Sequence, residues 1–411
     1  MHRTVVSGPR FRSLVAIGAI VALGAFAVSC GDDDSDDGSA SSSDEKVVKI
    51  GVIAPLDAGL TSFGHGIENS VQLAVDQANA DDAIPGWEIE VTAVDDSSDP
   101  AIGATAAETV AGDDAVVGVV GTYNSGVAAE VAPILDDAGI AMISPSNTDP
   151  TLTIGPDRSA PSRQFDSYFR LVATDAQQGP FLANYATDDL GAQTVAIVSE
   201  TKAVSRGLAD DFSAAFTEAG GEVVSDTTVP DGTTDFTTIV DQIAPLNPDL
   251  LFFGGEYEVA AALRTAAADI AAPLMGGDGI KDDAYIAGAG ARAEGDLAGF
   301  VGAPLATLET AADFRDDYEA AGFADPSTDY GPYAFDAANL LIDAAAVALE
   351  DEDRVTPEAR EVVIEQLQGV DLRGASGAIV FDEFGDTVTK VLTMYQVTDG
   401  AWVAVDVEEV G

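Results

Sequence analysis

The sequence predicts an α/β fold with two doubly wound parallel-sheet lobes joined by a three-crossing hinge. Buried apolar runs alternate with helical patterns from residue 47 to 143, and the alternation restarts from residue 194 to 276. Such alternation is typical of βαβ units and parallel sheets. Three further helical patterns have no strands between them. Because they cannot form an independent α/β unit, we expect them to return to the first sheet, with crossings near residues 175, 301 and 385.

The strands of the first unit are expected at residues 47–53, 87–94, 115–120, 140–143 and 168–172, with a loop at 54–66 and helices at 67–79, 99–111 and 127–135. The second unit opens with a helix over residues 175–190, where Asp175 to Gln178 fit a capping box. Its further strands are expected at 194–199, 222–225, 250–254 and 273–276, and its helices at 205–219, 236–246 and 259–268. The final section starts at residues 299–301 and predicts helices at 311–321, 332–349 and 357–367, and strands at 378–381, 390–397 and 401–405.

The N-terminal residues predict export rather than folding. Residues 1–29 combine a basic start with a short apolar run, which is typical of a secretory signal peptide. Cys30, the only cysteine, follows at the position where bacterial lipoproteins carry their lipid anchor, although an ordinary signal peptide with an incidental cysteine is the alternative. Residues 30–46 then predict an acidic flexible tether. The folded part divides into an N-terminal lobe, residues 47–174 plus 301–385, and a C-terminal lobe, residues 175–300 plus 386–411.

The charge balance narrows the classes of partner. The chain carries 71 acidic and 18 basic residues, a formal net charge of -53. Such a surface repels nucleic acid and anionic lipid, so we expect contact with a membrane only through the anchor. A site for cationic substrates is one interpretation of the acids. Because they are spread over the whole chain, we favour a solvated surface adapted to high salt.

Residues 116–150 predict a binding wall. Gly121 to Gly126 follow one expected strand and Ser144 to Thr148 follow the next, and both runs are small or hydroxyl-bearing. Ligands of open α/β sheets bind beyond the carboxyl ends of strands, beside helix N-termini whose free N–H groups attract anions. We therefore expect this stretch to hold the anionic end of a small solute.

Catalytic and metal-binding patterns are missing from the sequence. His65 is the only histidine after the signal peptide, which excludes a two-histidine metal site, and no Gly-x-Ser-x-Gly elbow occurs. Residues 288–293 match a loose dinucleotide fingerprint without a preceding strand. We expect no metal, no cofactor and no enzyme activity, with a hydrolase using two cleft carboxylates as a minor alternative.

Four segments carry a resemblance to a known family: residues 49–59 (KIGVIAPLDAG), 139–153 (GIAMISPSNTDPTLT), 169–179 (FRLVATDAQQG) and 381–386 (FDEFGD). Together they resemble the leucine/isoleucine/valine-binding proteins, which are type I periplasmic binding proteins of ABC transporters. The resemblance covers about residues 47 to 405. It implies a Venus flytrap fold that closes on an amino acid or related small polar solute, with a membrane permease as partner.

The resemblance also implies the ligand-binding residues. Ser125 matches the serine that holds the ligand's α-carboxylate, with a simple N-cap as the alternative role. Residues of the next loop contribute to the same wall. Asp278 matches the acid that meets the ligand's ammonium. Ser146, Asn147 and Thr148 are the residues of that next loop, on the same wall as Ser125. Phe63 matches the aromatic residue that lines the pocket in the family.

Two positions depart from the family pattern. Val204 and Glu256 stand where the family has tyrosines, although Tyr257 could replace the lost aromatic ring if the register shifts. Glu256 disfavours a purely aliphatic ligand, so an amide, urea-like or cationic ligand is the alternative to a branched-chain amino acid. We expect a monomer anchored to the outer face of the cytoplasmic membrane through Cys30. A ligand-sensing receptor of the same fold is the alternative to transport.

Overall fold

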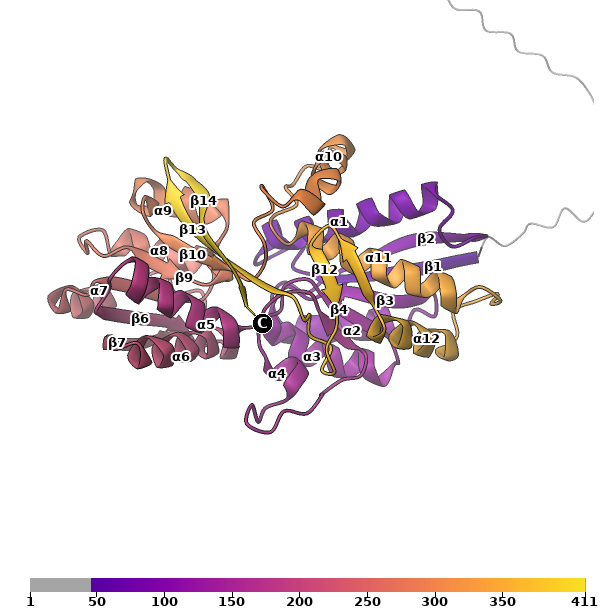
Figure 1. The fold of residues 1–411 in the computed structure, drawn as a ribbon, viewed down its shortest axis with the longest axis horizontal. Helices are drawn as coiled ribbons and strands as arrows, with labels where there is room; N and C mark the ends of the chain where they lie inside the picture. The colour runs from indigo at the N-terminus through magenta and orange to yellow at the C-terminus, as the bar shows by residue number, and fades with distance from the viewer. Residues whose placement is uncertain (1–45, 411) are drawn as a thin grey trace, which may run out of the picture. The chain divides into compact units, whose positions relative to one another are not determined.

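The computed structural model describes residues 46–410, so the predictions for the signal peptide, Cys30 and the tether up to residue 45 lie outside the described residues. The first sheet has five strands in the order β2-β1-β3-β4-β5 (Figure 1). All of its pairings are parallel, as predicted. The strands are β1 (Lys46–Ala54), β2 (Trp87–Asp95), β3 (Val116–Gly121), β4 (Ala141–Ser144) and β5 (Tyr168–Arg170).

The helices between these strands are α1 (Thr61–Ala80), α2 (Pro100–Ala111), α3 (Ser125–Asp137) and the short α4 (Thr151–Ile154). The predicted loop at residues 54–66 is wrong in its second half, because α1 begins at Thr61. Gly64 and Gly66 weaken the helical pattern there, since glycine disfavours a helix. Both are needed for packing: a Cβ on Gly64 would lie 1.9 Å from the Pro55 carbonyl oxygen, and one on Gly66 would lie 2.7 Å from that of Ser327.

The second sheet has seven strands in the order β14-β13-β10-β9-β8-β6-β7. Strands β6 to β10 pair in parallel, whereas β13 and β14 form an antiparallel hairpin at one edge. The last strand runs to Val410, five residues beyond its predicted end. The strands are β6 (Thr194–Glu200), β7 (Glu222–Val229), β8 (Leu250–Gly254), β9 (Leu274–Gly276), β10 (Leu297–Phe300), β13 (Lys390–Thr398) and β14 (Ala401–Val410).

The helix that opens this second unit is capped one residue earlier than predicted. Thr174 is its N-cap and forms the capping box with Gln177, so the box is not the run from Asp175 to Gln178. The shift leaves the Asp175 carboxylate without a capping role. The helical elements are α5 (Asp175–Asn184), a π-helical turn (Tyr185–Asp189), α6 (Ala203–Glu218), α7 (Thr237–Ile243), α8 (Tyr257–Ala266) and α9 (Asp283–Ala289), with 3-10 turns at Ala244–Leu246, Asp278–Ile280 and Gly290–Ala293.

The last section packs on the first sheet. Helix α11 (Gly331–Ala348) lies against α1 and β3, and α12 (Pro357–Gln368) lies against α11 and β3. A short hairpin of β11 (Asp371–Gly374) and β12 (Gly377–Val380) follows, and α10 (Ala312–Ala321) precedes α11. These contacts support the proposed division into two lobes, whose boundaries stay a prediction. No helix among residues 46–410 has both the length and the apolar character that crossing a membrane requires.

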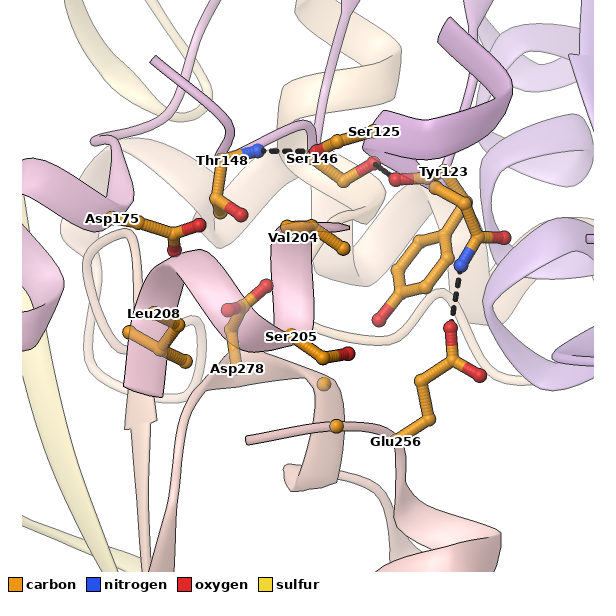
Figure 2. A pocket seen from close by; sticks show the side chains of 13 residues that line it. Tyr123, Ser125, Ser146, Thr148, Asp175, Val204, Ser205, Leu208, Glu256 and Asp278 are labelled. Carbon is orange, nitrogen blue, oxygen red and sulfur yellow. Dashed lines mark hydrogen bonds between the residues drawn. The ribbon is translucent and has the colours of Figure 1, made fainter. Parts of the chain in front are cut away.

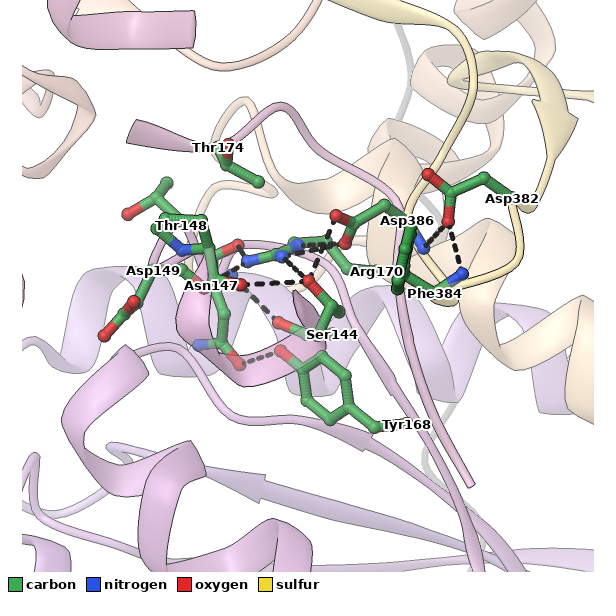
Figure 3. A network of polar contacts seen from close by, with 12 residues as sticks. Ser144, Asn147, Thr148, Asp149, Tyr168, Arg170, Thr174, Asp382, Phe384 and Asp386 are labelled. Carbon is green, nitrogen blue, oxygen red and sulfur yellow. Dashed lines mark hydrogen bonds and ion pairs between the residues drawn. The ribbon is translucent and has the colours of Figure 1, made fainter. Parts of the chain in front are cut away.

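A buried ion pair fixes the third expected crossing beside the first sheet (Figure 3). The guanidinium of Arg170, at the end of β5, lies 2.7 Å from Asp386 and has no exposed side-chain surface. Arg170 also donates to the carbonyl oxygens of Asn147 (3.2 Å) and Asp149 (2.7 Å). The loop after β4 is therefore held on both sides of Thr148. A Cβ on Gly385 would lie 2.4 Å from the Tyr168 carbonyl oxygen, so this close approach requires glycine.

Candidate ligand-binding site

A pocket of about 60 Å³ lies at the carboxyl ends of strands from both sheets (Figure 2). Six of the eight predicted ligand-binding residues line it: Ser125, Ser146, Thr148, Val204, Glu256 and Asp278. The other lining residues are Tyr123, Asn124, Asp175, Ser205, Leu208, Gly255 and Gly279.

The wall from the first sheet is built on the start of α3 and the loop after β4. Ser125 is the first residue of α3, and its Oγ accepts hydrogen bonds from the N–H groups of Thr148 (3.1 Å) and Asp149 (3.3 Å). The hydroxyl proton of Ser125 stays free to donate to a ligand. Ser146 Oγ donates to the carbonyl oxygens of Thr122 (3.2 Å) and Tyr123 (3.3 Å). Because the first N–H groups of a helix have no intrahelical partner, this wall favours an anion.

Asn147 and Phe63 do not line the pocket but lie behind its first wall. Asn147 is fully buried, donates to the carbonyl oxygens of Thr122 (2.9 Å) and Tyr123 (2.8 Å), and accepts from Tyr168. The ring of Phe63 stacks on that of Tyr123 with centroids 4.5 Å apart. Phe63 therefore supports the aromatic ring of Tyr123, which lines the pocket, and the prediction that Phe63 itself lines it is wrong. Tyr257 packs edge-on against Phe63 at 5.8 Å and does not replace a lining aromatic.

The opposite wall presents the carboxylate of Asp278, which follows β9. Its Oδ1 accepts from Gln178 Nε2 (2.9 Å) and its Oδ2 accepts from the Tyr330 hydroxyl (2.5 Å). Gln178 Oε1 also accepts from the Asp278 N–H at 2.8 Å. The Gln178 side chain therefore holds both the backbone N–H and the carboxylate of Asp278. Burial raises the pKa of Asp278, and the bonds from Tyr330 and Gln178 offset part of that rise.

Asp175 is a second acid at the pocket that the sequence reasoning did not select. It is 1% exposed, and its Oδ2 has no hydrogen-bond partner among residues 46–410. Its Oδ1 accepts from Gln178 Nε2 at 3.3 Å, the same group that serves Asp278. Burial, followed by the nearby charge of Asp278, raises the pKa of Asp175 well above its usual value. The pair therefore favours a cationic group placed between them.

Glu256 joins the two walls at the other end of the pocket. Its Oε1 accepts from Asn124 Nδ2 at 2.6 Å, and its Oε2 pairs with Lys202 Nζ at 2.5 Å. Figure 2 shows Asp175 and Glu256 at opposite ends of the pocket, with Val204 and Asp278 between them. The Glu256 carboxylate is thus balanced by a local cation, whereas those of Asp175 and Asp278 have no such partner within the described chain.

The residues missed by sequence reasoning were hidden for two reasons. Asp175 was assigned to a helix cap, and only the actual cap at Thr174 releases its carboxylate. Its place in the segment 169–179, which carries the family resemblance, is the signal that could have found it. Leu208 lies one turn after Val204 on α6, so helical spacing from that position would have selected it, whereas Ser205, the next residue, follows from no such spacing.

The alternative chemistries considered from the sequence gain no support. No three His, Cys, Asp or Glu side chains within residues 46–410 come together as a metal site. His65 lies on α1 beside Glu68, at 3.5 Å, and is not among the lining residues. Residues 288–293 fall at the end of α9 and in a 3-10 turn, without the preceding strand that a dinucleotide fingerprint requires.

Comparison with known proteins points to a single family. The periplasmic binding protein family matches residues 47–401. The Leu/Ile/Val-binding protein BraC3 of Rhizobium johnstonii is 31% identical over 363 residues, which are 87% of this chain and 94% of that protein. The Leu/Ile/Val-binding protein homolog 3 of Brucella melitensis is 28% identical over 362 residues, which are 87% of this chain and 94% of that protein.

Solved structures show the same fold. The branched-chain amino acid transporter substrate-binding protein LivJ of Streptococcus pneumoniae, in complex with isoleucine, superposes with a TM-score of 0.77 at 27% identity, covering 89% of this chain and 100% of that one. The leucine-binding protein LivK of Thermotoga maritima gives a TM-score of 0.75 at 25% identity, covering 88% and 98%. These matches confirm the predicted α/β fold class with two mainly parallel sheets.

Proposed function

From the premise that the chain belongs to the periplasmic binding protein family, in the type I group of the Leu/Ile/Val-binding proteins, we propose that it binds an amino acid for an ABC transporter. Membership of this family of binding proteins confirms the prediction that the chain is not an enzyme. The proposed role is that of an extracytoplasmic solute receptor.

The observation that carries the amino-acid ligand is the opposite character of the two walls. One wall offers the start of α3 and the hydroxyl of Ser125, which suit a carboxylate. The other offers the buried Asp175 and the half-buried Asp278, which suit an ammonium. A zwitterion satisfies both walls at once. A neutral or purely anionic solute leaves at least one buried carboxylate without a cation.

Closure of two lobes on the ligand is supported by polar contacts that join elements of the two sheets. Asn124 donates to Glu256 (2.6 Å), Ser62 donates to Asp282 (2.9 Å) and Tyr330 donates to Asp278 (2.5 Å). A ligand that touches both walls binds the closed state more tightly than the open one and so shifts the population toward it. We propose the hinge at the three predicted crossings.

The N-terminal sequence and the relatives together support a location and a partner for the receptor. The lipid on Cys30 would hold the receptor at the outer face of the cytoplasmic membrane, with residues 31–45 as tether. Relatives whose names describe branched-chain amino acid transport support a membrane permease as partner. We propose that the receptor acts as a monomer and binds no nucleic acid, in keeping with its net charge of -53.

Isothermal titration calorimetry with a panel of α-amino acids, amides and polyamines tests this function. We expect saturable 1:1 binding of at least one α-amino acid, and loss of that binding when its carboxylate is amidated or its amine acetylated. Equal binding of the amidated or acetylated derivative would contradict the zwitterion assignment. Binding of no α-amino acid at all would overturn the proposed function.

A further inference from the structure

Two hydrogen-bond acceptors at the pocket lack a partner within the protein. Among residues 46–410 three buried side-chain atoms have no hydrogen-bond partner, and two of them, Asn124 Oδ1 and Asp175 Oδ2, belong to lining residues. An unpaired buried acceptor costs free energy, which a donor on a bound molecule recovers. The two atoms therefore indicate where a ligand presents its donors.

The end of the pocket at Asp175 favours a charged hydrogen-bond donor. Asp175 is 1% exposed, and Gln178 Nε2 divides its hydrogen bonds between Asp175 Oδ1 (3.3 Å) and Asp278 Oδ1 (2.9 Å). The two carboxylates therefore share Gln178 Nε2, Asp278 has the Tyr330 hydroxyl as a further donor, and Asp175 Oδ2 is left over. The α-ammonium of an amino acid has three donors, enough to serve Asp175 and Asp278 together.

The end of the pocket at Asn124 favours a second hydrogen-bond donor, on another part of the ligand. The amide of Asn124 has a defined orientation, because Nδ2 donates to Glu256 Oε1 at 2.6 Å and the reverse orientation would set Oδ1 against that carboxylate. Its Oδ1 is therefore an acceptor that remains to be paired. Glu256 Oε2 is already paired with Lys202, which leaves the Asn124 oxygen as the acceptor that a ligand can satisfy. In Figure 2 Glu256 and Asp175 lie at opposite ends of the pocket, so one ammonium does not reach both.

We infer, resting on the amino-acid-binding function proposed above, that the side chain of the ligand carries a nitrogen donor that Asn124 Oδ1 accepts. A carboxamide supplies this donor in neutral form and an ammonium supplies it in charged form. An aliphatic side chain of the same shape buries Asn124 Oδ1 without a donor. A side-chain carboxylate sets a third acceptor oxygen against Asn124 Oδ1 and Glu256.

Near-isosteric ligands separate this inference from the proposed function. Asparagine, leucine and aspartate have side chains of closely similar size and shape, and 2,4-diaminobutyrate carries the ammonium form. In calorimetry with the wild-type protein we expect asparagine or diaminobutyrate to bind at least about ten-fold more tightly than leucine, and aspartate to bind most weakly. The stronger of the two nitrogen ligands identifies the donor as neutral or charged.

Leucine binding as tightly as both nitrogen ligands would overturn this inference and leave the proposed function intact. Failure of every α-amino acid would overturn both. Asn124→Ala then tests the residue itself: it should reduce the preference over leucine to within about three-fold, because the acceptor is gone. The side chain of Asn124 makes no capping bond to α3, so α3 should remain folded.

The matched variant is Asp175→Asn. It should weaken asparagine and leucine by the same factor, because it acts on the α-ammonium that they share. A preference for asparagine that survives in Asn124→Ala, or that disappears in Asp175→Asn alone, would contradict the assignment of the two ends. Circular dichroism and the thermal midpoint of each variant establish that it is folded.

Discussion

The guanidinium of Arg170 and the carboxylate of Asp386 form a buried ion pair across 216 positions of sequence, with Nε 2.8 Å from Oδ1. Thr153 completes the pair by accepting from Arg170 Nη2 and donating to Asp386 Oδ2. Through its bonds to the carbonyl oxygens of Asn147 and Asp149, Arg170 connects the third crossing to the loop that carries Thr148 (Figure 3). The segment of the third crossing and the loop of the binding wall are therefore held by one network of hydrogen bonds.

Breaking this pair should destabilise the protein strongly. We expect Asp386→Ala to lower the free energy of unfolding by about 3–5 kcal/mol, because it leaves a buried guanidinium without its counter-ion. Chemical denaturation measures the loss. Asp226→Ala is the control: it breaks the partly exposed pair with Arg206 and should cost less than about 1 kcal/mol. Equal costs for the two variants would contradict the structural role of the buried pair.

Ser125→Ala should weaken ligand binding with a smaller effect on stability. The hydroxyl is placed to donate to the ligand's carboxylate, and a hydrogen bond to a charged group contributes about 1.5–3 kcal/mol, so Kd should rise by about ten-fold or more. Titration calorimetry with the best amino acid provides the value. Ser70→Ala removes another buried hydroxyl, which donates within α1 to the Gly66 carbonyl oxygen, and should leave Kd unchanged. An unchanged Kd in Ser125→Ala would remove this residue from the site.

Affinity should fall as the pH is lowered. Burial raises the pKa of both Asp175 and Asp278, so these carboxyls take up protons at a higher pH than exposed ones. The ligand's ammonium binds their ionised forms, and protons therefore compete with it. Calorimetry in buffers of different ionisation enthalpy should detect proton release on binding over the pH range where these groups titrate. Asp175→Asn should reduce that release, and a pH-independent Kd in the wild type would contradict the prediction.

Asp96→Asn should stabilise the protein at neutral pH. Burial raises the pKa of Asp96 to about 7, whereas the unfolded chain loses this proton near pH 4, so the stability contributed by the protonated form is lost as the pH rises toward 7. The shift of about three pKa units corresponds to about 4 kcal/mol at about 1.4 kcal/mol per unit, so we expect a gain of up to about 4 kcal/mol at pH 7.5 and none below pH 4.

The neighbouring Asp95→Asn is the matched control for that prediction. Burial alone would raise its pKa, but hydrogen bonds from Ser97, Asp57 and Leu56 lower it overall. Asp95 therefore stabilises the fold when ionised, and its replacement should destabilise the protein at pH 7.5. Denaturant unfolding of both variants at pH 4 and 7.5 measures these differences, and a shift of the same sign for the two at pH 7.5 would be contrary to the account.

The order of strands and helices was predictable because buried parallel strands are continuous apolar runs. All six residues of β3 and all five of β8 are buried, and each run stands out in the sequence. The start of α1 could not be predicted in the same way. Gly64 and Gly66 are needed for close contacts with Pro55 and Ser327, and only the folded chain brings these residues together. Tertiary packing there overrides local propensity.

The site was predictable where one residue follows a strand end and unpredictable where two distant side chains combine. Ser125 and Asp278 each occupy such a strand-end position and line the pocket. The unpaired oxygen of Asn124 depends on Glu256, 132 residues away, and that of Asp175 depends on how Gln178 is shared with Asp278. No local pattern encodes these relationships.

A crystal structure of the protein with its tightest-binding amino acid would show directly which wall holds which end of the ligand. We expect the ligand's carboxylate to lie within hydrogen-bond distance of Ser125 Oγ and the first N–H groups of α3. Its ammonium should lie between Asp175 and Asp278. A ligand bound outside this pocket, or bound with its carboxylate facing these two acids, would contradict the account.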